Sequence, residues 1–74
     1  MHLIGHLVAY YQYGNRTGPV AIGMIIHYDK FDLFRQYVIE WFTVEGTKVA
    51  KYNLEDTLRW RAEYEYFREQ NEIL

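Results

Sequence analysis

The fold of this 74-residue chain is decided by residues 20–42, VAIGMIIHYDKFDLFRQYVIEWF. Two apolar runs, 20–28 and 34–42, flank the polar link 29–33. Both runs are rich in the β-branched and aromatic residues that suit a pleated, half-buried surface. The link is short enough to join them as an antiparallel hairpin. Alternation in the second run then predicts three inward side chains, those of Tyr37, Ile39 and Trp41.

The flanking segments extend this hairpin into a four-stranded sheet. Residues 7–13 are expected to form the first strand, and residues 14–19, with two glycines and a proline, the loop that follows it. Gly23 within the second strand marks a bend, a bulge or a close backbone approach. After a turn at residues 43–47, residues 48–52 are predicted to be a short edge strand. Its lysines, Lys48 and Lys51, are expected to face water.

A C-terminal helix follows the last strand. Asn53 is a good N-cap, and Glu55 and Asp56 place carboxylates at the positive end of the helix. Nothing breaks the helical pattern before about residue 72. We therefore expect one domain over residues 1–74, mainly β, with a small barrel of four to five antiparallel strands in residues 1–53 and a helix over 54–72.

Composition narrows the classes of function. The chain carries eight basic and ten acidic residues, a net charge of −2, which offers no general attraction to phosphate backbones. It contains no cysteine, so neither disulfides nor thiolate chemistry is available. No apolar run approaches the ~18 residues of a membrane span, and the N-terminus lacks the order of charges and apolar residues typical of a signal peptide. We expect a soluble protein with no membrane partner.

The order of these motifs is similar to that of a known protein family. The elements are Ile4-Gly5-x-Leu7-Val8-x-Tyr10, a glycine loop, Val20-x-Ile22-Gly23-x-Ile25, Tyr37-x-Ile39-x-Trp41, a glycine turn and Tyr52-x-Leu54. They resemble the short SH3-like barrel proteins of tailed bacteriophages, most of all those from phages of cyanobacteria and other aquatic bacteria. The resemblance covers residues 4–58 and implies an SH3-like barrel and a viral origin. The long charged and aromatic helix departs from that pattern.

Catalytic and metal-binding motifs are not found in the sequence. His2 and His6 lie four residues apart and His27 is remote, which is a poor basis for a metal site, and Gly5 weakens a helix between the first two. No carboxylate pair has a spacing that requires acid–base chemistry, and nucleophile elbows and phosphate loops are absent. We therefore expect no enzymatic activity, no metal and no cofactor.

A nucleic-acid surface is a second interpretation. Small barrels often bind RNA or DNA, and aromatic and basic side chains together can stack and hold bases. The candidates in this chain are Tyr11, Tyr13, Arg16 and Arg35, with Tyr10 beside them. The acidic balance and the lack of a lysine or arginine cluster speak against this reading.

The helix carries two apolar stripes at 100° per residue. Leu54, Leu58, Ala62 and Tyr66 form the first stripe, which is expected to dock on the barrel. Trp60, Tyr64 and Phe67 form the second, an aromatic surplus typical of binding hot spots. The alternatives are that both stripes pack on the barrel or that the first one is exposed. With the second stripe free, Trp60→Ala would leave the fold intact and weaken association.

These patterns favour a non-enzymatic protein-interaction module. Trp60, Tyr64 and Phe67 are the expected anchors, with Arg61 and Arg68 as rim charges, and the partner is a second copy or another protein. The resemblance implies a structural or accessory component of the phage virion, or a factor in the host cytoplasm that binds a bacterial protein. Presence in purified particles would separate the two.

Overall fold

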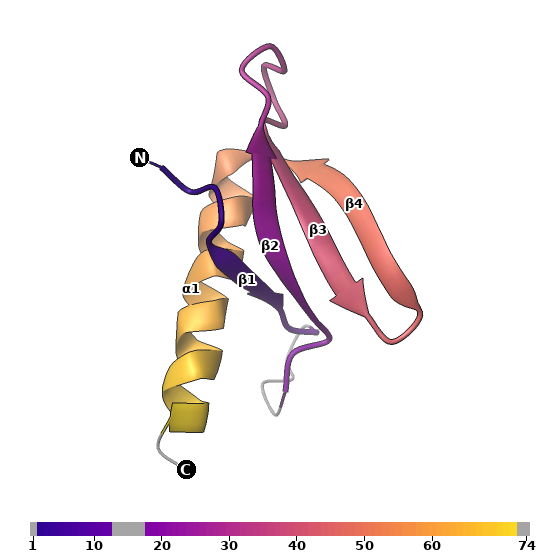
Figure 1. Cartoon of the computed structure of the whole chain (residues 1–74). Coiled ribbons are helices and arrows are strands. Elements are labelled where there is room, and N and C mark those ends of the chain that lie inside the picture. The colour runs from indigo at the N-terminus through magenta and orange to yellow at the C-terminus, as the bar shows by residue number, and fades with distance from the viewer. Residues whose placement is uncertain (1, 13–17, 73–74) are drawn as a thin grey trace.

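The computed structural model describes residues 2–12 and 18–72 and shows a four-stranded antiparallel sheet followed by a helix (Figure 1). The strands are β1 (Leu7–Tyr10), β2 (Ala21–Tyr28), β3 (Tyr37–Thr43) and β4 (Gly46–Tyr52), and the helix is α1 (Leu54–Glu72). The strands pair in the order β1-β2-β3-β4, so that β1 and β4 are the edges. This confirms the mainly β sheet with a C-terminal helix. The more specific expectation of an SH3-like barrel stays a prediction.

The hairpin of β2 and β3 is confirmed, with two differences from the prediction. Gly23 pairs in register with Trp41 at a close backbone approach, one of its three predicted roles, and the irregularity of the strand lies further on, between Ile25 and His27. Residues 34–36, predicted as strand, belong to the loop, because β3 begins only at Tyr37. At the other end of the sheet β1 stops at Tyr10, shorter than predicted, and Tyr13 lies outside the described residues.

The core lies on one face of the sheet, beneath α1. Tyr37, Ile39 and Trp41 point into it as predicted, with 9%, 0% and 8% of their surfaces exposed. Its other members come from β1, β2 and the segment before β1: Leu3, Val8 and Ile25. Leu3 is buried because the chain turns back at Gly5, whose φ of 90° suits glycine and whose amide donates to the Ile25 carbonyl.

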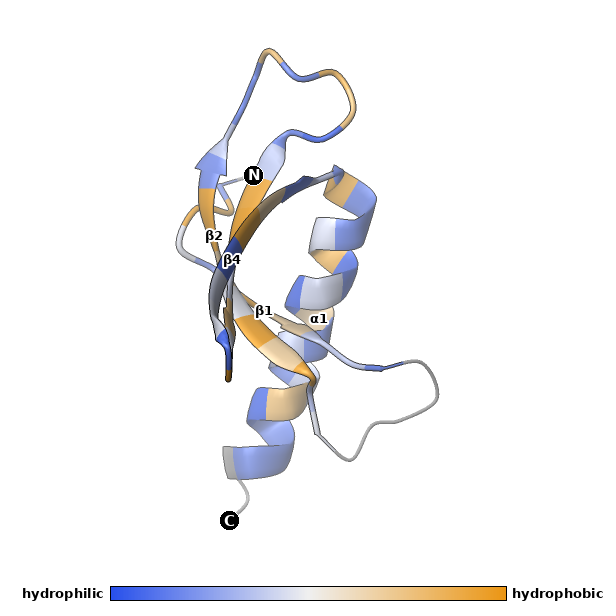
Figure 2. Ribbon diagram, turned by 90° about the vertical axis from the view of Figure 1, so that its right-hand side faces the viewer, coloured by the Kyte–Doolittle hydropathy of each residue, from blue (hydrophilic) through white to orange (hydrophobic). Residues whose placement is uncertain are grey.

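The helix begins as predicted. The Asn53 side chain accepts a hydrogen bond from the Asp56 amide at 2.8 Å, and Thr57 Oγ1 donates to the Asn53 carbonyl at 2.7 Å. Thr57 is thereby satisfied although it is fully buried. The helix lies across one face of the sheet and packs chiefly on β1, so that the face near β4 is left open (Figure 2).

The face of α1 that meets the sheet differs from the one predicted. Leu54 is 45% exposed and Ala62 is exposed, so the expected docking stripe contributes mainly Leu58 to the core. Instead Trp60 packs against the core, and the fully buried Thr57 lies one turn before it on the same face. Thr57 can be buried on this face because its amide and its hydroxyl both donate to the Asn53 carbonyl.

Candidate functional site

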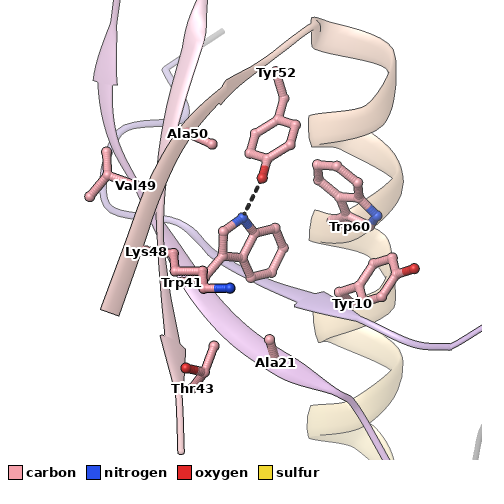
Figure 3. Close-up of a pocket in the computed structure, with 9 residues that line it drawn as sticks. All are labelled: Tyr10, Ala21, Trp41, Thr43, Lys48, Val49, Ala50, Tyr52 and Trp60. Carbon is pink, nitrogen blue, oxygen red and sulfur yellow. Dashed lines mark hydrogen bonds between the residues drawn. The ribbon is translucent and has the colours of Figure 1, made fainter. Parts of the chain in front are cut away.

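An open groove lies between the β4 side of the sheet and α1 (Figure 3). Its volume is about 600 Å³. The residues that line it come from each of the five elements and are almost all apolar or aromatic: Tyr10, Ala21, Trp41, Thr43, Lys48, Val49, Ala50, Tyr52 and Trp60. We call this feature the aromatic groove. Such size and lining are typical of binding sites in proteins.

Three rings set the shape of the aromatic groove. The Trp60 ring stands edge-on to Tyr52, at a centroid distance of 4.7 Å and an angle of 88°, and edge-on to Trp41 at 5.4 Å and 78°. Trp41 Nε1 donates a hydrogen bond of 3.0 Å to the Tyr52 hydroxyl, which satisfies the indole within the cluster. Edge-to-face contacts of this kind stabilise a fixed ring geometry. The groove is therefore pre-formed.

Strand pairing explains why these side chains share one face. In the β3–β4 register Trp41 lies opposite Lys48 and Tyr37 lies opposite Tyr52, so their side chains project to the same side. Between them stands Ala50, whose small side chain leaves space where a larger residue would fill the groove. Gly23 on β2 allows the Trp41 ring to lie close against the sheet, because a Cβ there would meet Trp41 Cε3 at 2.9 Å.

The lining favours the binding of apolar groups. Lys48 is the one charged side chain among the described residues of the groove, and Thr43 adds a hydroxyl. The Arg59 guanidinium lies 5.6 Å from the centre of the Trp60 ring, on the helix side. Six of the seven residues of β4, the outer wall, are exposed, so a bound molecule can extend out of the groove. The arrangement suits a polypeptide that inserts large side chains.

A second apolar surface lies in the loop between β2 and β3, residues 29–36, which we call the tip loop. Phe31, Leu33 and Phe34 are 83%, 78% and 78% exposed. In Figure 1 the loop projects beyond the end of the sheet, and Figure 2 shows it arching above the start of α1. Three large apolar side chains that lie close together and exposed on a protruding loop form an apolar patch, which indicates an interaction site.

Hydrogen bonds within the tip loop hold its backbone. Asp29 accepts from the Phe31 amide at 3.0 Å, and Asp32 accepts from the Phe34 and Arg35 amides at 2.9 and 2.8 Å. Such aspartate-centred turns fix a loop without strand pairing. Lys51 on β4 completes the arrangement, with its ammonium 2.7 Å from Asp29 and 3.6 Å from Asp32.

These contacts shift the pKa values of the three charged groups. The Lys51 hydrogen bond, followed by that of the Phe31 amide, holds the pKa of Asp29 below its usual value. The pKa of Asp32 is lowered first by the Arg35 amide and then by the Phe34 amide. In return, the Asp29 carboxylate raises the pKa of Lys51. Because the pKa values of Asp29 and Asp32 are lowered in the folded chain, their carboxylates stabilise the fold at neutral pH. This stabilisation is lost as the pH falls below about 4.

Because different groups lower the pKa values of Asp29 and Asp32, the substitution Lys51→Met should change the two pKa values by different amounts. The pKa of Asp29 should rise towards its usual value because it loses its main partner. The pKa of Asp32 should rise less, because backbone amides that remain in place are its main cause. Carboxyl carbon shifts in an NMR titration of the wild type and the variant measure both values. Equal rises at the two aspartates would contradict this assignment of causes.

The other predicted partner-binding residues of the helix are partly engaged within the chain. Tyr64 and Phe67 are half-buried and contact each other, with ring centroids 6.1 Å apart. Arg61 Nε donates to His6 Nδ1 at 2.7 Å, and Arg68 lies 3.7 Å from Glu65. Of the predicted stripe only Trp60 packs against the core and lines the groove. Tyr64 and Phe67 lie outside that lining, and their part in binding stays a prediction.

Of the predicted nucleic-acid residues, the two that the structure describes, Tyr11 and Arg35, are not brought together. Tyr11 follows the end of β1 and packs against Tyr66 with ring centroids 6.1 Å apart, whereas Arg35 lies in the tip loop. Tyr10, which precedes Tyr11, pairs with the first residue of β2, and the tip loop begins after the last residue of β2. The two groups therefore lie at opposite ends of that strand. Tyr13 and Arg16 lie outside the described residues.

Residues 2–12 and 18–72 contain no group of three or more histidine, aspartate or glutamate side chains arranged to hold a metal ion. Across the same residues no helix is both long and apolar enough to cross a membrane. Comparison with protein-family models, with curated proteins and with solved structures gave no match.

Proposed function

We propose that this protein is a non-enzymatic interaction module whose aromatic groove receives apolar side chains of a protein partner. The supporting observation is the groove itself, a pre-formed space of about 600 Å³ framed by Trp41, Tyr52 and Trp60. Tryptophan and tyrosine are enriched at the energetic centres of protein interfaces. Trp60 keeps the anchoring role expected from the sequence, as a wall of the groove.

The wider role that we propose is that of a small structural or accessory component of a tailed bacteriophage. The support for this part is the resemblance of residues 4–58 to small phage barrel proteins. A factor that binds a host protein is the alternative, and the aromatic groove would serve either role.

Both tryptophans of the chain, Trp41 and Trp60, line the groove, so their fluorescence reports on its occupancy. We expect short peptides selected from a displayed random library to be enriched in large apolar residues. Their binding should shift the emission to shorter wavelength, because peptide side chains replace water beside the indoles.

A matched pair of β4 variants locates the binding. Ala50 lines the groove, so Ala50→Arg should weaken the selected peptides at least about tenfold, which corresponds to about 1.4 kcal/mol. Thr47 is exposed on the same strand but does not line the groove, so Thr47→Arg should leave affinity unchanged. Equal losses in the two variants, or a library that yields no binder, would contradict the proposed function.

A further inference from the structure

We propose that the chain self-associates head to tail, with the tip loop of one copy inserted in the aromatic groove of the next. The inference rests on the proposed function of the groove and names its occupant. Two apolar surfaces of this small chain support it: the tip loop, which protrudes, and the aromatic groove, which is hollow.

The tip loop has the exposure and the fixed backbone that favour insertion into a groove. Its three apolar side chains, Phe31, Leu33 and Phe34, are almost fully exposed, while the backbone beneath them is held by the carboxylates of Asp29 and Asp32. A loop already held in one conformation loses little entropy on binding, so more of the contact energy is available for affinity.

The groove matches the tip loop in size and apolar character. A volume of about 600 Å³ has room for more than one large side chain, and its walls offer ring edges and faces to incoming phenylalanine rings. The tip loop balances its two aspartates with Lys30 and Arg35, and both aspartates pair with Lys51 of their own chain, so the loop brings no net charge to an almost entirely apolar lining.

The two surfaces occupy different parts of the subunit. The tip loop lies where β2 ends and β3 begins, whereas the groove includes Thr43 at the far end of β3 and Tyr10 at the far end of β1. A contact between two different patches is heterologous, so it repeats from copy to copy and produces a ring or an open filament. A tip-to-tip dimer would instead stop at two copies.

Sedimentation velocity from about 1 µM to about 1 mM tests this inference on the full chain. The wild-type mass should rise from 9.0 kDa to beyond twice that value as concentration increases. Two variants should stay monomeric. One is the tip variant Phe31→Ser, Leu33→Ser, Phe34→Ser, which keeps the backbone amides bound by Asp29 and Asp32. The other is the groove variant Ala50→Arg.

Controls are available for both variants. Val44 is a fully exposed apolar residue in the other hairpin turn, so Val44→Ser should assemble like the wild type. Thr47→Arg places the same new charge on β4 outside the groove and should also assemble. Circular dichroism of each variant verifies that its fold is retained.

Mixing the two monomeric variants gives the decisive result. The tip variant keeps an intact groove and the groove variant keeps an intact tip, so one productive contact remains. The mixture should therefore form a 1:1 heterodimer and nothing larger. A heterodimer is not expected from tip-to-tip or groove-to-groove association.

Several outcomes would overturn the inference. These are a wild type that stays at 9.0 kDa throughout, a groove variant that still associates, or a mixture that stays monomeric. A monomeric protein whose tip loop binds vesicles of phosphatidylethanolamine and phosphatidylglycerol would also overturn it and would assign the tip to a membrane surface. Peptides that bind the groove of a strictly monomeric protein would leave the proposed function standing; without such peptides both would fall.

Discussion

Trp41→Ala is expected to unfold this protein. The Trp41 ring is 8% exposed, contacts Tyr52 and Trp60 edge-on, and donates its indole N–H to Tyr52. Removal of a buried tryptophan costs about 3–5 kcal/mol, and a domain of this size rarely has more than about 3–5 kcal/mol of stability. Circular dichroism at 25 °C should show loss of the folded spectrum, and the emission of the remaining Trp60 should move to the wavelength of water-exposed indole.

Trp41→Phe separates the contribution of ring packing to stability from that of the indole hydrogen bond. It keeps an aromatic group against Gly23 and Trp60 but leaves the Tyr52 hydroxyl without its indole donor, so we expect a loss of about 1–3 kcal/mol in a chain that still folds. Val44→Ala, at a fully exposed residue, should stay within about 0.5 kcal/mol of the wild type. A Trp41→Ala variant with wild-type resistance to urea would show that the cluster does not support the fold.

Gly23→Ala is expected to destabilise the fold by about 1–3 kcal/mol, the usual cost of overpacking. An added Cβ would lie 2.8 Å from the Glu40 carbonyl oxygen and 2.9 Å from Trp41 Cε3. Relief of the first contact disturbs the pairing of β2 and β3, and relief of the second requires the indole to shift. Urea unfolding followed by tryptophan emission measures both the loss of stability and the altered surroundings of the Trp41 ring.

Gly18→Ala is the matched control for this substitution. An added Cβ at Gly18 meets no atom within 4 Å, so its effect should be within about 0.5 kcal/mol. If both alanine variants were equally stable, the close approach of Trp41 to β2 would not be the reason for glycine at residue 23.

The parts of the fold that could be predicted are those governed by local chemistry. The central hairpin followed from alternation, and the helix start followed from Asn53, whose side chain caps the amide of Asp56. The link between β2 and β3 was predicted at residues 29–33, but residues 34–36 were assigned to the strand because Phe34 was counted with the apolar run that follows. Asp32 is the residue that could have revealed the longer loop. Its carboxylate accepts from the amides of Phe34 and Arg35, and an aspartate in this position favours a turn over a strand.

The groove could not be predicted because it depends on register and on the rotation of the helix. Its lining joins Ala21, Ala50 and Trp60, which lie in three different elements and have no common sequence period. The two helix stripes were similar in apolar character, so the sequence could not identify the one facing the sheet. The burial of Thr57, which the Asn53 carbonyl makes possible, is the tertiary feature that distinguishes them.

The junction at Asn53 has a mechanical consequence for the site. One residue separates the end of β4 from the start of α1, and these two elements are facing walls of the same cavity. The cap hydrogen bonds of Asn53 hold it to the first turn of α1, and the backbone of this one residue therefore sets the angle between the two walls. A bound molecule that moves the two walls apart must change the backbone angles at Asn53, a residue that does not line the groove.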